Sequence, residues 1–177
     1  MISSRKMKMI CVTDSDLAIG YQGKLLFHLS KDMEHFKKLT MGHIVVMGRK
    51  TRESLPMGKP LPGRINIILT RDKAYMAEGF IICHSMQEVK LVIEEIVNQE
   101  NAETADKECF VIGGEEIYKL FLEEADTVYR TKVFAKAKNA DTWFPNLDEK
   151  PDWMLQSESS HYVENGVEFA FLYYTKK

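Results

Sequence analysis

Short apolar runs recur along the chain and predict β-strands. The runs are rich in Ile and Val, and most do not alternate with polar residues, which is typical of strands buried on both faces of a parallel sheet. They span residues 7–13, 43–47, 65–70, 80–83, 109–112, 127–134 and 169–174.

Helical periodicity fills several of the intervals between these runs. Apolar residues three and four positions apart follow Ser30, Ser85 and Gly114 and predict helices there. Residues 85–88 read Ser-Met-Gln-Glu, a capping box in which the Ser hydroxyl and the Glu carboxylate satisfy free amides at a helix start. Because strands alternate with helices, we expect parallel strand pairing with helices on both faces of the sheet.

The last third of the chain follows a different pattern. After Asp126 the helical periodicity stops, and two late strands over residues 153–161 and 168–175 flank the turn signal Glu-Asn-Gly at 164–166. The sequence therefore predicts an α/β fold whose mixed sheet is parallel first and ends in an antiparallel hairpin. Two loops rich in Gly or Pro, 14–29 and 55–64, mark a ligand site, because ligands bind beyond the carboxyl ends of the strands in such sheets.

Composition and charge exclude several classes of protein. The 177 residues are 45% hydrophobic and 28% charged, as in an ordinary folded domain, and we expect one domain over residues 1–177. With 24 basic and 26 acidic residues and no like-charge block, nothing indicates nucleic-acid binding. Cys11, Cys83 and Cys109 lie far apart in apolar runs, which argues against disulfides. No signal-peptide core or membrane span is evident, so we expect a cytoplasmic protein without a membrane partner.

Asp32 is the first candidate for chemistry. It lies three residues after Leu29 and four before Phe36, so a carboxylate and an aromatic ring share one helical face. An acid turned toward an apolar pocket can bind a cationic or amidine-like heterocycle. The alternative is an exposed acid in the first helical turn, where the helix dipole favours it.

Three further segments suit ligand binding. Gly-Arg-Lys-Thr at 48–51 follows a strand and opens a short helix, so amides, cations and a hydroxyl could gather around a phosphate; solvated charges are the alternative. Gly-Gly at 113–114 allows close approach of a ligand to the backbone, or is a simple tight turn. Arg64 suits bidentate pairing with a carboxylate, or is a surface arginine.

Other chemistries lack a sequence signature. The five histidines show no metal-ligand spacing, so no metal is expected. Neither a G-x-G-x-x-G fingerprint nor a phosphate-binding P-loop is present, and no Ser or Cys lies in a nucleophile motif.

Taken in order, the segments resemble dihydrofolate reductase. The matching segments are 19–20, 29–37, 46–54, 59–70, 111–114 with Tyr118, and 141–145, which together span nearly the whole chain. Their shared order and spacing make the resemblance specific. It implies an α/β fold with a central, mostly parallel eight-stranded mixed sheet, helices on both faces and a C-terminal antiparallel hairpin. It also implies reduction of 7,8-dihydrofolate to tetrahydrofolate by hydride transfer from NADPH to pterin C6, with protonation at N5.

The resemblance also implies roles for individual residues. Asp32 would hold the pterin ring and favour its protonation, Thr131 would orient Asp32, and Tyr118 would border the nicotinamide; these are the implied catalytic residues. The implied substrate-binding residues are Ile10, Asp32, Phe36, Leu55, Leu61, Arg64, Ile112 and Thr131. The implied cofactor-binding residues are Val12, Ile19, Gly48, Arg49, Lys50, Thr51, Leu69, Thr70, Arg71, Gly113, Gly114 and Tyr118.

Further family features follow from the same resemblance. A cis peptide would join Gly113 to Gly114, loop 14–29 would be a mobile lid, and the chain would bind antifolate inhibitors as a monomer. The sequence departs from the family pattern in Leu-Phe at 26–27 instead of Pro-Trp, in Arg52 instead of an aromatic residue, and in the acids at 115–116 beside the expected cofactor phosphates.

Two other functions stay open at this point. One is a reductase of the same fold that acts on another pyrimidine- or pterin-like ring, as in riboflavin biosynthesis; the pairing of Asp32 with Arg64 argues against it, since Arg64 suits a glutamate tail. The other is a folate- or nucleotide-binding module without turnover, suggested by Phe27 in place of a tryptophan.

Overall fold

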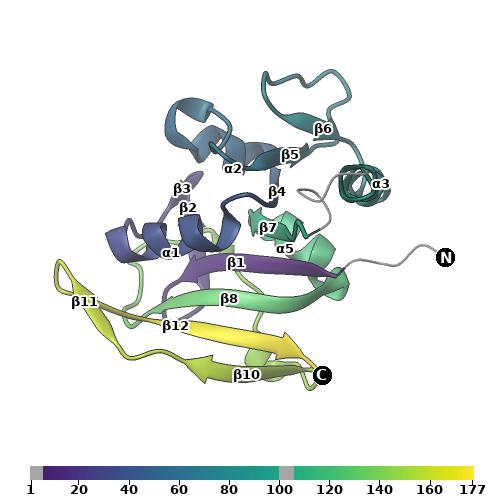
Figure 1. Cartoon of the computed structure of the whole chain (residues 1–177). Helices are drawn as coiled ribbons and strands as arrows, with labels where there is room; N and C mark the ends of the chain where they lie inside the picture. Colours follow the sequence, from purple (N-terminus) through teal and green to yellow (C-terminus); the bar gives the residue numbers. More distant parts are fainter. Residues whose placement is uncertain (1–5, 100–105) are drawn as a thin grey trace.

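The computed structural model describes residues 6–99 and 106–177, in which strands and helices alternate before a run of antiparallel strands (Figure 1). The strands are β1 Met7–Thr13, β2 Ala18–Tyr21, β3 Lys24–Leu25, β4 Ile44–Gly48, β5 Ile65–Leu69, β6 Ile81–Cys83, β7 Cys109–Gly113, β8 Ala125–Val133, β9 Thr142–Trp143, β10 Trp153–Glu158, β11 Tyr162–Glu164 and β12 Val167–Lys176. The helices are α1 Ser30–Thr40, α2 Arg49–Ser54, α3 Met86–Val97 and α5 Glu115–Phe121, with the 3-10 turns η1 Pro56–Gly58, η2 Leu122–Glu124 and η3 Leu147–Glu149.

The main sheet has the predicted mixed character. Its strand order is β10-β12-β8-β1-β7-β4-β5-β6, and β11 also pairs with β12. In this order, neighbouring strands between β8 and β6 pair in parallel, and every pair that includes β12 is antiparallel. Because β1 and β7 lie in the middle, the loops that follow them meet at one edge of the sheet, where a ligand site is expected.

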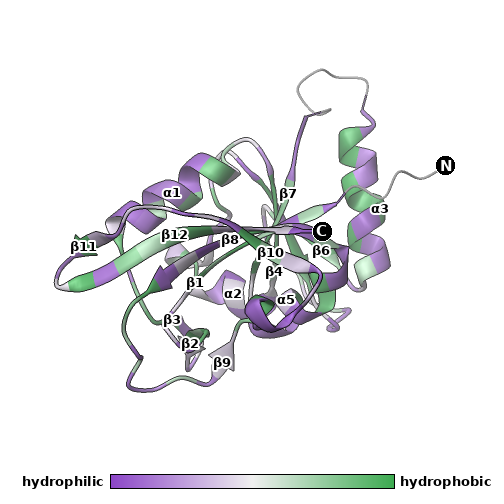
Figure 2. Cartoon of the chain, turned by 90° about the horizontal axis from the view of Figure 1, so that it is seen from below, coloured by the Kyte–Doolittle hydropathy of each residue, from purple (hydrophilic) through white to green (hydrophobic). Residues whose placement is uncertain are grey.

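The two faces of the sheet carry separate apolar layers. Successive side chains of a strand point to opposite faces, so Met9 and Cys11 of β1 join one cluster with α3 and α5, whereas Ile10 joins another with Phe36 of α1. Figure 2 shows α1 and α5 on opposite sides of the sheet. Helices therefore cover both faces, as predicted.

Helix α3 begins where the capping box places it. Ser85 Oγ accepts a hydrogen bond from the amide of Glu88 at 3.1 Å, and the Glu88 carboxylate accepts one from the amide of His84 at 2.7 Å. Ser85 thus satisfies an amide that the first turn leaves free, and Glu88 bonds to the amide of the residue before the cap.

Two predictions about strands were wrong. The late strand predicted over 153–161 ends at Glu158 as β10, and a separate strand, β11 at 162–164, is the one that the turn at Asn165 and Gly166 joins to β12. In addition, β2 and β3 from loop 14–29 form a separate sheet with the distant strand β9, in the order β3-β2-β9. Strands of two to four residues are too short to show periodicity, and their pairing is decided by segments far apart in the chain.

In the part of the chain that the structure describes, no helix is both long and apolar enough to cross a membrane.

Candidate active site

Asp32 lies in the first turn of α1 and its half-buried carboxylate meets β8. Thr131 Oγ1 donates a hydrogen bond to Asp32 Oδ1 at 2.6 Å. Burial raises the pKa of the Asp32 carboxyl, the hydrogen bond from Thr131 lowers it, and the charge of Glu164 raises it. The alternative of an exposed acid in the first turn is therefore wrong. A carboxyl whose pKa is raised, and which a hydroxyl orients, suits proton exchange with a bound ring.

An apolar wall continues from Asp32 along the same face of the sheet. Phe36 lies one helical turn beyond Asp32 and packs with the buried Ile10, Val45 and Met47. The structure brings most of the predicted substrate residues into this one cluster, namely Ile10, Phe36, Leu55, Leu61 and Ile112. One acid at the edge of an apolar wall suits a flat heterocycle with a polar edge.

Arg64 lies at the other end of α1. Its Nη1 donates to Thr40 Oγ1 at 3.2 Å, and its Nε donates to the carbonyl of Pro62 at 2.9 Å. Within residues 6–99 and 106–177, no ion pair involves Arg64. A guanidinium fixed by neutral groups keeps donors available for a carboxylate ligand.

Tyr118 links the middle strands to α5. Its hydroxyl donates to the carbonyl of Ile10 at 2.6 Å, and burial raises the pKa of Tyr118 well above its ordinary value. Tyr118 also packs in the same cluster as Ile19, whereas Val12 packs against the cluster around Leu29. A neutral phenol that bonds to β1 holds this corner of the sheet rigid.

Gly113 and Gly114 form a cradle beside Tyr118. Their peptide bond is cis, which confirms the expectation for this pair. A Cβ built on Gly113 would lie 3.4 Å from Thr51 Oγ1 and 3.4 Å from the Tyr118 hydroxyl, and its φ of +127° also favours glycine. Because neither position carries a side chain, a dinucleotide could approach the backbone closely between α2 and α5.

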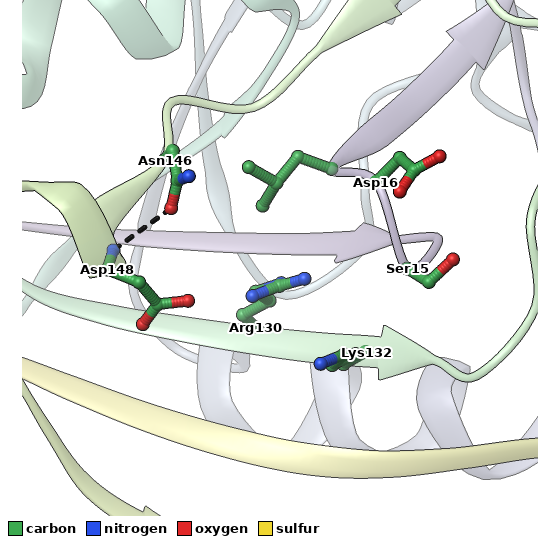
Figure 3. Close-up of a pocket in the computed structure, with 7 residues that line it drawn as sticks. Ser15, Asp16, Arg130, Lys132, Asn146 and Asp148 are labelled. Atoms are coloured by element: carbon green, nitrogen blue, oxygen red, sulfur yellow. Dashed lines mark hydrogen bonds between the residues drawn. The ribbon is translucent and has the colours of Figure 1, made fainter.

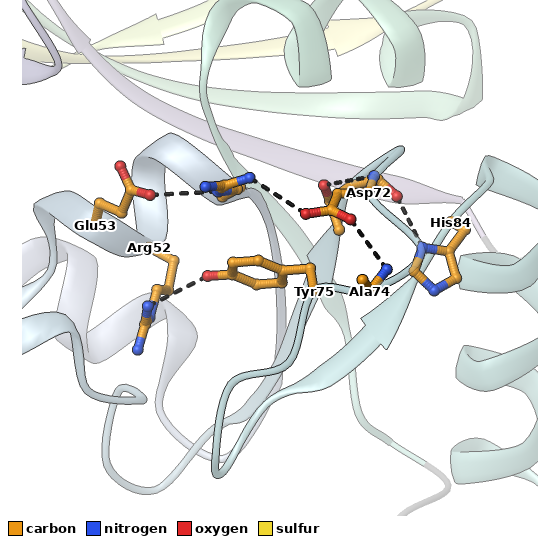
Figure 4. Close-up of polar contacts among 8 residues, drawn as sticks. Arg52, Glu53, Asp72, Ala74, Tyr75 and His84 are labelled. Atoms are coloured by element: carbon orange, nitrogen blue, oxygen red, sulfur yellow. Dashed lines mark hydrogen bonds and ion pairs between the residues drawn. The ribbon is translucent and has the colours of Figure 1, made fainter.

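The predicted phosphate-binding cations lie on an exposed edge. Arg49 Nε lies 3.4 Å from Glu53 Oε1 and its Nη1 lies 3.6 Å from Asp72 Oδ2. Figure 4 shows this network, which Asp72 continues by accepting a hydrogen bond from the amide of Ala74 at 3.0 Å. The charge of Arg49 is thus partly neutralised by two acids, Glu53 and Asp72.

Arg52 has a role within the fold. Its Nη1 donates to the Tyr75 hydroxyl at 3.3 Å (Figure 4). Its Nε donates to the carbonyl of Gly58 at 2.9 Å, and its guanidinium lies over the ring of Phe80. These contacts tie loop 55–64 to the segment after β5. The side chain that replaces the family's aromatic residue therefore fills a structural position.

The remaining predicted cofactor residues cluster near the same edge. Leu69 is buried at the end of β5, and the Thr70 hydroxyl accepts a hydrogen bond from the amide of Asp72 at 3.2 Å. His84 Nδ1 lies 3.0 Å from the Thr70 carbonyl (Figure 4). The residues that the structure gathers at the carboxyl ends of β4 and β5 are Gly48, Arg49, Lys50, Thr51, Leu69, Thr70 and Arg71.

Loop 14–29 is held by two carboxylates that the sequence analysis missed. Asp14 is buried, and it accepts hydrogen bonds from the amides of Asp16, Ala18 and Ala137, each at 2.8 Å. Asp141 accepts one from the amide of Gln22 at 2.9 Å. An acid directly after a buried strand was the available signal for Asp14, because such side chains bond to nearby backbone amides.

A polar pocket of about 290 Å³ lies on the far side of β8. Arg130 points into it and donates to Thr13 Oγ1 at 2.9 Å, whereas the neighbouring Thr131 faces Asp32. The residues that line the pocket, drawn in Figure 3, are Ser15, Asp16, Leu17, Arg130, Lys132, Asn146 and Asp148. None of them is a predicted site residue, so this pocket is separate from the candidate site.

The comparisons with known proteins agree with this geometry. The family model described as Dihydrofolate reductase matches residues 6–176. The chain belongs to the dihydrofolate reductase family. It is 35% identical to dihydrofolate reductase of Bacillus subtilis (strain 168) over 170 residues, which cover 95% of this chain and 93% of that one. It is 31% identical to dihydrofolate reductase of Staphylococcus aureus (strain COL) over 173 residues, which cover 97% and 98%.

A solved structure supports the same assignment of fold. Dihydrofolate reductase from Enterococcus faecalis, complexed with NADP(H) and RAB-propyl, superposes with a TM-score of 0.81 at 29% identity. The match covers 97% of this chain and 96% of that chain. The predicted fold class is therefore confirmed.

The departures from the dihydrofolate reductase pattern have visible consequences. Phe27 packs with Val12 against the apolar cluster that includes Leu29, so it supports loop 14–29 by packing. The Glu115 carboxylate accepts a hydrogen bond from the amide of Trp143 at 3.1 Å and pairs with Lys119 at 3.5 Å. Glu115 is thus engaged by other groups within the fold.

Proposed function

We propose that this protein reduces 7,8-dihydrofolate to 5,6,7,8-tetrahydrofolate with NADPH, in support of one-carbon and thymidylate metabolism. The observation that carries the proposal is the hydrogen bond of 2.6 Å between Thr131 and Asp32, at the edge of an apolar wall. Membership of the dihydrofolate reductase family supports the substrate and the cofactor, as do the names of the relatives.

Asp32 holds the reacting ring in this proposal. Its carboxylate accepts hydrogen bonds from a pterin ring nitrogen and the 2-amino group, and it stabilises the positive charge that develops as N5 is protonated. Thr131 fixes the direction of the carboxylate through its hydroxyl. Because burial raises the pKa of Asp32, the site keeps a proton available at a higher pH than an exposed acid would.

The rest of the substrate lies along the wall. The aromatic tail of the folate packs on Phe36, Leu55 and Leu61, and its α-carboxylate pairs with Arg64. The support from Arg64 is its lack of an ion pair in the described ranges, together with its position at the far end of α1 from Asp32. A substrate without a glutamate tail would leave this cation unused.

The cofactor lies across the carboxyl ends of β4, β5 and β7. When bound, NADPH supplies the hydride, and the protein sets its distance and orientation to the pterin. Val12, Ile19 and Tyr118 border the nicotinamide, and the cradle at 113–114 admits the dinucleotide backbone. The phosphates and the adenosine end meet side chains of Arg49, Lys50, Thr51, Thr70 and Arg71.

We further propose a single domain over residues 1–177 that acts as a monomer in the cytoplasm and binds antifolate inhibitors at the Asp32 site. The Enterococcus faecalis structure, with its NADP(H) and RAB-propyl, supports a site that admits a cofactor and a second ligand together.

The test follows the loss of NADPH absorbance with dihydrofolate as substrate. We expect turnover by the wild type, and a fall of at least about 100-fold in kcat for Asp32→Asn, because the substitution removes the acid that favours protonation. Asp126→Asn makes the same change near the other end of β8 and is expected to retain activity.

Two other results would point to the remaining alternatives. Tight folate binding without hydride transfer in a single turnover would identify a binding module. Turnover of another pterin or pyrimidine in a substrate panel, with none of dihydrofolate, would identify a different reductase of the same fold. Equal activity of the wild type and Asp32→Asn would refute the proposed mechanism.

A further inference from the structure

Helix α1, which carries Asp32, has no cap of its own. The residue before it is Leu29, whose side chain cannot accept a hydrogen bond from the free amides of the first turn. The acceptor comes instead from the other end of the chain. Glu164 Oε2 accepts from the amide of Ser30 at 2.8 Å, and Glu164 Oε1 lies 3.3 Å from the amide of Lys31.

The hairpin that carries Glu164 is attached to α1 at further points. Glu164 is the last residue of β11, directly before the turn into β12. Lys31 Nζ lies 4.3 Å from the centre of the Tyr162 ring, and the His35 ring stacks on Phe171 at 4.2 Å. The carboxylate is therefore held in place by contacts on both sides of it, rather than being a chance surface contact.

This contact is one residue away from the reacting acid. The amide of Lys31 directly precedes Asp32, so Glu164 binds the backbone next to the residue whose side chain meets Thr131. A carboxylate at a helix N-terminus also interacts favourably with the helix dipole. At the same time it is a like charge for Asp32.

We propose that Glu164 is a positioning residue for the reaction: from the β11–β12 hairpin it fixes the start of α1, holds Asp32 against Thr131, and places a like charge at the helical turn that carries Asp32. This inference rests on the proposed function for its catalytic consequence. Its structural part, the effect of Glu164 on the ionisation of Asp32, can be measured without turnover.

Few other ionisable groups compete for this role. From β1 and α5, Cys11 and Tyr118 are within electrostatic range of Asp32, and both stay neutral because burial raises the pKa of Cys11 to about 12 and that of Tyr118 well above its ordinary value. On α1 itself, burial lowers the pKa of His35, and the ammonium of Lys31 is turned to the Tyr162 ring. From β8 the neutral hydroxyl of Thr131 meets Asp32, so Glu164 supplies the charge that acts on it.

The test compares two glutamates of the same hairpin. Glu164→Gln removes the charge but keeps a side-chain oxygen for the Ser30 amide. Glu168→Gln is the matched control, because the Glu168 carboxylate lies 2.8 Å from His161 Nδ1 and, among the described residues, forms no hydrogen bond or ion pair with α1. The ionisation of Asp32 is followed in the full chain by the ¹³C resonance of its carboxyl carbon, assigned by its loss in Asp32→Asn.

We expect Glu164→Gln to move the titration midpoint of Asp32 to lower pH, because the like charge that opposes its ionisation is gone. Glu168→Gln should leave the midpoint at the wild-type value. In hydride-transfer assays the alkaline limb of the pH profile should move in the same direction. Glu164→Ala, which also removes the cap, should lower kcat about three- to tenfold, with Glu164→Gln recovering part of the loss.

An Asp32 midpoint in Glu164→Gln that equals the wild type, or that moves no further than in Glu168→Gln, would overturn the inference. A wild type that does not reduce dihydrofolate would refute the proposed function alone, because the carboxyl titration still reports on Glu164. An unchanged pH profile beside a shifted titration would show that Glu164 acts on Asp32 but not on the chemistry, which contradicts the catalytic half of the proposal.

Discussion

Asp32 and Arg49 are both charged groups at a candidate ligand site, but their surroundings differ. Asp32 is half-buried, takes one short hydrogen bond from Thr131, and has a raised pKa. Arg49 has 48% of its side chain exposed and lies between two exposed acids at 3.4 Å and 3.6 Å. Burial lets the fold control the charge state of Asp32, whereas water and salt screen the interactions of Arg49.

The comparison indicates where a single substitution matters most. Removing a partner from a buried or desolvated charge leaves a group that nothing else can satisfy. Removing a partner from an exposed ion pair leaves a group that water satisfies at little cost. We therefore expect large effects around α1 and small effects on the exposed edge beside α2.

Arg64 offers the largest effect after Asp32 itself. We expect Arg64→Met to raise KM for dihydrofolate by roughly 10- to 100-fold, since it removes a charge-assisted, bidentate partner of the substrate carboxylate. Initial rates over a range of dihydrofolate concentrations measure this change. A dihydropterin that lacks the glutamate tail is the control, and it should be reduced equally well by both proteins. An equal loss with both substrates would mean that Arg64 supports the fold instead.

Thr131 offers an intermediate effect. We expect Thr131→Val to lower kcat about tenfold, because a hydrogen bond to a charged group contributes roughly 1.5–3 kcal/mol. Burial and the hydrogen bond act in opposite directions on the pKa of Asp32, so losing the hydrogen bond should move the alkaline limb of the pH profile to higher pH. This is opposite to the shift expected for Glu164→Gln. Thr131→Ser keeps the hydroxyl and should restore most of the rate; a profile that stays in place would contradict this role.

Asp72 offers the smallest effect. We expect Asp72→Asn to lower KM for NADPH about two- to threefold, because it frees Arg49 from an exposed acid while keeping an oxygen for the amide of Ala74. The gain should disappear at roughly 0.5 M salt, where exposed charges are screened. Glu78→Gln, the same change at another exposed position of this segment, should have no effect. A gain that persists in high salt would show that the edge is less exposed to solvent than the structure indicates.

Much of the framework could be predicted from the sequence. The run over 7–13 is β1, and the capping box at 85–88 starts α3, because both signals depend on neighbouring residues. The resemblance also indicated the pair of Asp32 with Thr131, although 99 positions separate them. Local pattern alone left Asp32 open between a buried and an exposed acid.

Contacts between distant segments could not be predicted in this way. The small sheet of β2, β3 and β9 depends on strands as short as two residues, which carry no periodicity. The pairing of Arg49 with Asp72 joins an exposed helix to an exposed turn, and no pattern in either segment indicates the other. The buried Asp14 likewise meets Ala137 only in the folded chain.

By itself, the sequence determined most strands of the main sheet, the main helices, the order of the motifs and hence the family. Those features depend on hydrophobic periodicity and on local hydrogen bonding, which the order of residues fixes directly. Only the tertiary structure decided the ionisation of the charged groups at the site. Whether Asp32 is protonated depends on its burial, on Thr131, and on Glu164, whose contact with α1 spans 134 positions, because electrostatic energies depend on distance and solvent exposure in the folded molecule.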